Sequence, residues 1–72
     1  MLRINGKDAE AAGKTVAEYL SAANYDPRQV AVERNEEIVP KAEYGTTVLQ
    51  DGDIVEIIMF MGGGSGAGKS GN

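Results

Sequence analysis

Neither cysteine nor histidine occurs among the 72 residues of the chain. Without cysteine, the chain can form no disulfide and no cysteine-ligated metal site. Without histidine, it lacks the commonest general base, the commonest metal ligand and the usual partner of a nucleophilic serine. Catalysis by carboxylates alone stays open in principle, and we expect no metal site.

Long apolar runs and clustered positive charge are also missing. No apolar run approaches the ~20 residues of a membrane span, and the opening MLRINGKD lacks the long apolar core of a secretory signal. The net charge is -4, and the lysines and arginines are scattered. This charge argues against nucleic acid and is compatible with a basic protein surface as partner. We therefore expect a cytoplasmic protein that binds neither membrane nor nucleic acid.

The N-terminal segment predicts a β-hairpin within one small domain, whose core is thin because only roughly 60% of the unfolded surface can be buried at this size. Leu2 and Ile4 alternate with polar neighbours, as in a strand. Asn5-Gly6 is the strongest short hairpin signal, so we expect a second strand over about residues 7–12.

A helix is predicted over residues 15–23. Thr15 and Glu18 have the spacing of a capping box, in which each side chain covers a free backbone donor. One helical face is apolar and comprises Val16, Tyr19, Leu20 and Ala23. Pro27 prevents the helix from continuing.

The middle of the chain predicts short strands and turns. The expected segments are a third strand around 30–32, a polar turn over 34–37, a fourth strand over 38–39, an irregular stretch over 41–46 and an extended segment over 47–49. Lys7, Lys14 and Lys41 indicate nothing beyond solubility. We expect Glu33, Glu36, Glu37, Asp51 and Asp53 to be solvated surface or turn residues, with steering onto a basic partner as the functional alternative.

A final strand is predicted over residues 53–60, after an Asp-Gly turn. Side chains alternate across a strand, so Val55, Ile57 and Met59 should face the core. Ile58 and Phe60 should share the opposite, wetter face with Glu56. Three glycines, Gly62, Gly63 and Gly64, follow directly.

The order of elements predicts an α+β fold. One helix would cover one face of a four- to five-stranded mixed sheet, with the first and last strands parallel in its middle. This is the β-grasp, or ubiquitin-like, arrangement.

Residues 1–64 resemble the ThiS sulfur-carrier proteins of thiamine biosynthesis, which are ubiquitin-like. The matching segments are LRINGKD, VAVERNEEIVP, DGDIVEII and the final GGG. The strand followed by glycines is shared with carriers for molybdopterin and cysteine synthesis. The short length and the VAVERNEEIVP segment favour the thiamine branch.

The resemblance implies a protein co-substrate and not an enzyme. Its Gly64 carboxylate would be adenylated with ATP and then converted to a thiocarboxylate. Gly62 and Gly63 would let the tail enter a narrow channel, because they lack Cβ atoms. The implied partners are an ATP-dependent adenylyltransferase of the E1-like type, a cysteine desulfurase and the thiazole synthase. ATP is used by the activating enzyme, so this chain binds no cofactor.

The segment 65–72 departs from the family pattern, because it leaves Gly64 as an amide without a free carboxylate. We expect domain boundaries at 1–64 and 65–72, with the second segment a flexible extension. It is either a pro-segment removed by a processing protease or an added linker tail. GGSGAGKS at 63–70 matches a phosphate-loop pattern, but no helix follows to hold a phosphate, so we expect no nucleotide binding.

Ile58 and Phe60 are predicted to form a docking patch for the activating enzyme and the thiazole synthase, because they precede the tail. The alternative is that a loop or strand covers them. At the level of the whole chain, the alternatives are a ubiquitin-like modifier joined through Gly64, a plain interaction domain, or a linker role for the glycines.

Overall fold

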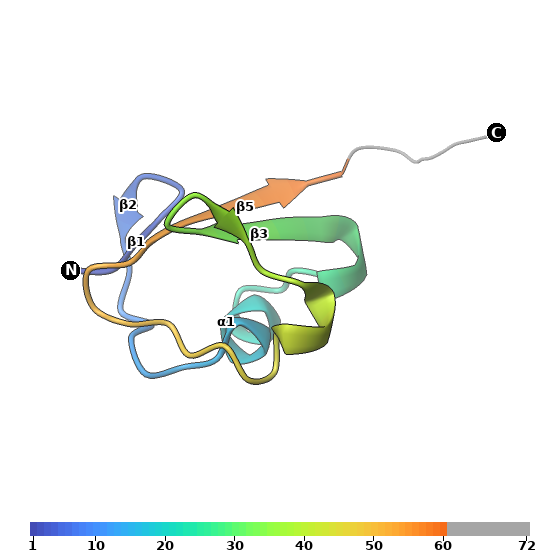
Figure 1. The fold of residues 1–72 in the computed structure, drawn as a ribbon, viewed down its shortest axis with the longest axis horizontal. Helices are drawn as coiled ribbons and strands as arrows, with labels where there is room; N and C mark the ends of the chain where they lie inside the picture. The colour runs from blue at the N-terminus through green and yellow to red at the C-terminus, as the bar shows by residue number, and fades with distance from the viewer. Residues whose placement is uncertain (61–72) are drawn as a thin grey trace, which may run out of the picture.

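The computed structural model describes residues 1–60, which form a five-stranded sheet with one helix on one face (Figure 1). The strand order is β2-β1-β5-β3-β4. Strands β1 (Arg3–Ile4) and β5 (Ile54–Met59) are parallel at the centre, and the other pairs are antiparallel. The predicted α+β, β-grasp architecture is therefore confirmed.

The first hairpin is shorter than expected. Asn5 and Gly6 form its turn with positive φ values of 54° and 81°. Strand β2 covers Lys7–Asp8 and does not reach residue 12. The reason is that Ala11 turns inward to the core and the Gly13 N–H then donates to the Leu49 carbonyl at 2.8 Å. The chain thus leaves the sheet to meet a distant loop, which no local pattern reveals.

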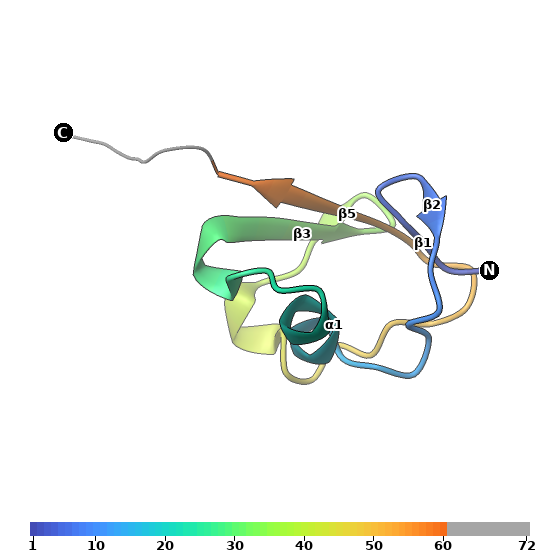
Figure 2. The ribbon, with the colours of Figure 1, turned by 180° about the vertical axis from the view of Figure 1, so that it is seen from behind.

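Helix α1 (Val16–Ala22) confirms the predicted capping box. The Glu18 N–H donates to Thr15 Oγ1 at 3.1 Å, and the Thr15 N–H donates to Glu18 Oε1 at 2.8 Å. Val16 and Leu20 are buried. Figure 2 shows the helix beneath the sheet from behind, so this apolar face closes one side of the core.

The second antiparallel pair is formed by β3 (Val30–Arg34) and β4 (Glu37–Ile38). Strand β3 is longer than predicted because it pairs with β5 along its whole length. Strand β4 begins one residue earlier than predicted, and Val39 leaves it to enter the core.

Two 3₁₀ turns, η1 (Pro27–Gln29) and η2 (Lys41–Glu43), lie in connecting segments. Residues 47–49 form no strand and contribute an isolated bridge between Thr15 and Val48. The core residues are apolar, apart from the Tyr44 hydroxyl: Leu2, Ile4, Ala11, Val16, Leu20, Val30, Val32, Val39, Tyr44, Leu49, Val55 and Ile57. Within residues 1–60, no helix could cross a membrane and no cluster of three or more potential metal ligands occurs.

Candidate functional site

The candidate site begins at the end of β5, because the predicted working residues follow it. Val55 and Ile57 face the core and are 2% and 8% exposed. Ile58 and Phe60 lie on the opposite side and are 46% and 57% exposed. No loop or strand covers these two residues in the described part of the chain, so they are available for docking.

Met59 corrects one prediction, since it is 56% exposed and does not belong to the core. Its side chain has the parity of Val55 and Ile57, but its surroundings differ. Strand β1 pairs with β5 only as far as Val55. Beyond that residue one edge of β5 has no neighbouring strand, and the apolar parity no longer guarantees burial.

The outer face of the sheet combines apolar and acidic side chains. Glu33 lies opposite Glu56 in the β3–β5 pair, and Ala31 lies opposite Ile58. Among the salt bridges of residues 1–60, none involves either glutamate. The docking residues therefore lie beside two unneutralised carboxylates, which suits a partner face with basic groups.

The start of β5 is anchored by Asp53, whose side chain is 13% exposed. Its Oδ1 accepts from Asn35 Nδ2 at 3.1 Å, and its Oδ2 accepts from the Gln50 N–H at 3.0 Å. Arg34 Nη1 lies 3.5 Å from the same carboxylate. Our expectation of a solvated Asp53 is therefore wrong, because the residue fixes the loop before β5 against the β3–β4 turn.

Lys41 is a residue that the sequence analysis missed. Its Nζ donates to the Pro27 carbonyl at 2.9 Å and to the Val30 carbonyl at 2.7 Å. It also lies 5.6 Å from the ring centroid of Tyr44 and 5.8 Å from that of Phe60. Its partners are distant in sequence, so no local pattern marks it, and the role limited to solubility is overturned.

The turn η1, which receives Lys41, is itself held by an ion pair. Asp26 accepts from the Arg28 N–H at 2.9 Å, from Nε at 3.2 Å and from Nη2 at 3.1 Å. These hydrogen bonds from Arg28 hold the pKa of the Asp26 carboxyl below its ordinary value. The carboxylate therefore stays charged at neutral pH and keeps the turn closed.

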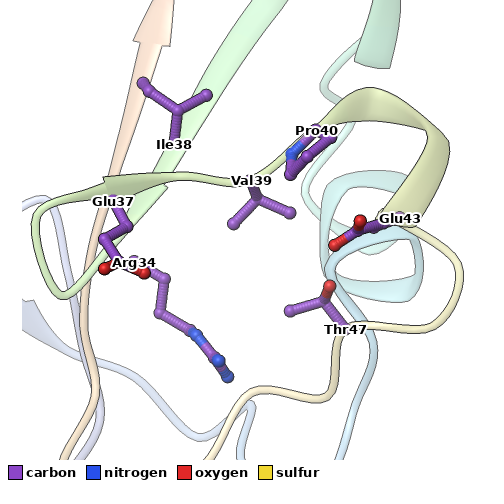
Figure 3. A pocket seen from close by; sticks show the side chains of 7 residues that line it. All are labelled: Arg34, Glu37, Ile38, Val39, Pro40, Glu43 and Thr47. Atoms are coloured by element: carbon purple, nitrogen blue, oxygen red, sulfur yellow. The ribbon is translucent and has the colours of Figure 1, made fainter.

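A pocket of about 110 Å³ lies between β4 and η2, away from the end of β5 (Figure 3). Its lining combines charged and apolar residues: Arg34, Glu37, Ile38, Val39, Pro40, Glu43 and Thr47. The Arg34 guanidinium already donates to the Val48 carbonyl at 3.2 Å. None of the predicted site residues lines this pocket, so we do not assign it to the function.

Gly62, Gly63 and Gly64, together with the segment 65–72, lie outside the described residues. Of the predicted site, the structure thus shows Ile58 and Phe60 and the strand that leads to the glycines. The division at residue 64 stays a prediction.

Comparison with known proteins identifies the family. The model of the ThiS family matches residues 2–64. The sulfur carrier protein ThiS of Bacillus subtilis is 39% identical over 66 residues, which cover 89% of this chain and 100% of that protein. A thiazole synthase of Paramagnetospirillum magneticum is 49% identical over 65 residues, or 89% of this chain. The chain spans about a fifth of that protein's length, 20%.

A solved structure agrees with both the fold and the family. The crystal structure of the thiamine biosynthesis protein ThiS from Geobacter metallireducens matches with a TM-score of 0.73 at 39% identity. The match covers 88% of this chain and 97% of that one. Sequence and fold thus agree over nearly the whole described region, and the chain belongs to the ThiS family.

Proposed function

We propose that the chain carries sulfur as a thiocarboxylate on Gly64 for synthesis of the thiamine thiazole. The observation that supports this most directly is the family match, which runs through the whole domain and ends at Gly64. A relative named as a sulfur carrier aligns over its entire length.

The chemistry requires a free carboxylate on Gly64. One carboxylate oxygen attacks the α-phosphorus of ATP, and pyrophosphate leaves. A sulfur nucleophile then attacks the acyl carbon and AMP leaves, which replaces a poor leaving group with a good one. In this proposal the chain is consumed and regenerated as a co-substrate, and the catalytic groups belong to its partners.

The end of β5 is a suitable base for such a tail. The last described backbone bond is donated by the Phe60 N–H to the Gln29 carbonyl at 2.9 Å. Four residues separate Phe60 from Gly64, and an extended segment of that length spans ~13 Å. The working end would thus reach beyond the domain surface while the domain remains docked.

The proposed partners are an E1-like adenylyltransferase, a cysteine desulfurase as sulfur source and a thiazole synthase as acceptor. Two thiazole synthases contain a segment similar to this chain, at 49% and 41% identity. This link between carrier and acceptor within single proteins supports the thiazole synthase as partner. A processing protease would be needed wherever residues 65–72 are present.

The first prediction concerns the working end. A chain ending at Gly64 should catalyse ATP–pyrophosphate exchange with its activating adenylyltransferase, because its terminal carboxylate can be adenylated. The 72-residue chain should not, because its carboxylate lies eight residues further on, up to ~26 Å away in an extended tail. The measurement is the exchange rate of labelled pyrophosphate into ATP.

A third protein, Gly63→Val in the chain ending at Gly64, controls for the tail itself. The added side chain should block a channel that admits glycine, and activity should be lost while the domain stays folded. Equal exchange by the 72-residue and shortened chains would show that Gly64 is not the working end.

A further inference from the structure

The last stretch of β5 is held from one side. Strand β1 pairs with β5 only as far as Val55, and Asn5 Oδ1 then accepts from the Ile57 N–H at 2.8 Å. After that residue β5 pairs with β3 alone, and its last bond joins the Phe60 N–H to the Gln29 carbonyl. The direction in which the chain leaves the sheet therefore depends on whatever holds Phe60 and Gln29.

The Lys41 ammonium lies where these parts meet. It donates to the carbonyls of Pro27 and Val30, which begin η1 and β3. It also lies within 5.8 Å of the ring centroids of Tyr44 and Phe60, in range of a cation–π attraction. Figures 1 and 2 show both 3₁₀ turns on the helix side of the sheet, at the end where β5 finishes. A single side chain thus joins η1, η2, the start of β3 and Phe60.

We propose that Lys41 is a positioning residue that fixes the direction in which the tail bearing Gly64 leaves the sheet. The inference rests on the proposed function, because tail direction matters when Gly64 must enter a partner's active site. A fixed exit reduces the number of tail directions that the partner would have to select, and so lowers the entropic cost of association. Lys41 acts through Phe60 and does not touch the reacting atoms.

The chemistry of the contact distinguishes three side chains at position 41. Methionine keeps the apolar stem but can neither donate to the two carbonyls nor attract the ring faces. Arginine supplies several donors and stacks on aromatic rings, so it can replace the lysine. Lys7 offers a matched control, because it is an exposed lysine on β2, and β2 and η2 lie at opposite ends of the molecule in Figure 1.

The enzymatic test uses chains ending at Gly64, which keep every described residue and every position of the family match. In pyrophosphate exchange, Lys41→Met should raise the KM for the carrier about tenfold and leave kcat unchanged, since the lost interaction aids association and not chemistry. Lys41→Arg should restore the KM to within about twofold. Lys7→Met should change neither constant. An unchanged KM for Lys41→Met, or no rescue by arginine, would overturn the proposal.

A second test needs no partner and uses the 72-residue chain. Amide hydrogen exchange at Phe60 should accelerate about tenfold in Lys41→Met, because local opening at the end of β5 becomes easier. Exchange at Asn5, whose N–H donates to the Val55 carbonyl at 2.9 Å, should stay unchanged. Equal protection of Phe60 in both proteins would refute the role of Lys41 even if the chain proves not to carry sulfur. Conversely, failure of the unsubstituted chain ending at Gly64 to exchange pyrophosphate would refute the proposed function.

Discussion

At the scale of single residues, Glu36 occupies a backbone conformation that its side chain disfavours. Its φ is 71°, and that of Asn35 is 53°. A two-residue hairpin turn of this kind needs positive φ at both positions, and the left-handed region costs a residue with a Cβ roughly 1–2 kcal/mol. The turn persists because Asn35 is bonded to Asp53 and accepts from the Ile54 N–H at 2.9 Å.

Replacing this residue by glycine should stabilise the domain. Glu36→Gly removes the Cβ strain, and the greater freedom of glycine in the unfolded chain offsets part of the gain. We expect the free energy of unfolding to rise by ~0.5–1 kcal/mol, measured by urea denaturation.

The neighbouring substitution Glu37→Gly is the control. Glu37 is a strand residue of β4 and not among the residues with positive φ, so glycine there should lower the free energy of unfolding by roughly 0.5–1 kcal/mol. The same sign of change in both variants would contradict the role given to the turn conformation.

At the scale of elements, β5 has two faces with different solvent exposure. Val55 lies in the core between the central strands and α1, and Glu56 points outward opposite Glu33. The alternation places these neighbouring residues in different surroundings, so each tests the other.

Val55→Asp should unfold the domain. It buries an unpaired carboxylate at a cost of several kcal/mol, against a total stability of ~5–15 kcal/mol for a domain. Circular dichroism and urea denaturation would report the loss.

Glu56→Ala, on the outer face, should change the free energy of unfolding by less than ~0.5 kcal/mol. Equal losses in Val55→Asp and Glu56→Ala would show that the faces are assigned wrongly.

At the scale of the whole molecule, the face of the sheet that α1 leaves open ends beside the tail. Ile58 and Phe60 lie on this face or at its end, just before the glycines. Ile54 lies on the same face at the opposite end of β5 and is 61% exposed. The arrangement provides two apolar sites that differ chiefly in their distance from the tail.

Ile58→Glu and Phe60→Glu should leave the fold intact and weaken association with the adenylyltransferase about tenfold, or ~1.4 kcal/mol. The reason is that each places a charge on an apolar contact near the presented tail. Binding measured by calorimetry and thiocarboxylate formation measured by intact mass would report the effect.

Ile54→Glu is the matched control, and we expect a smaller loss because it lies farther from the tail. Phe60→Glu also removes the ring beside Lys41, so Ile58→Glu separates docking from tail direction. Normal thiocarboxylate formation by Ile58→Glu and Phe60→Glu would remove docking from their role.

The structure confirms several sequence-based predictions that depend on neighbouring residues. The Asn5-Gly6 hairpin turn, the Thr15–Glu18 cap and the parity of Val55 and Ile57 all follow from local geometry and hydrophobic alternation. The parallel pairing of the outermost segments followed from the order of elements. The tail lies beyond the described residues, so Gly64 rests on the family match and its chemistry.

By itself, the sequence determined the elements and the face that each presents, because backbone conformation, capping and side-chain alternation act between residues close in the chain. Only the tertiary structure decided where each face meets another element. Met59 is exposed because β1 ends before reaching it, and Asp53 is enclosed because Asn35 lies against it. Lys41 acquires a role because the chain brings Pro27, Val30 and Phe60 around one ammonium group. These properties depend on contacts between residues far apart in sequence, which chain topology creates and local patterns do not contain.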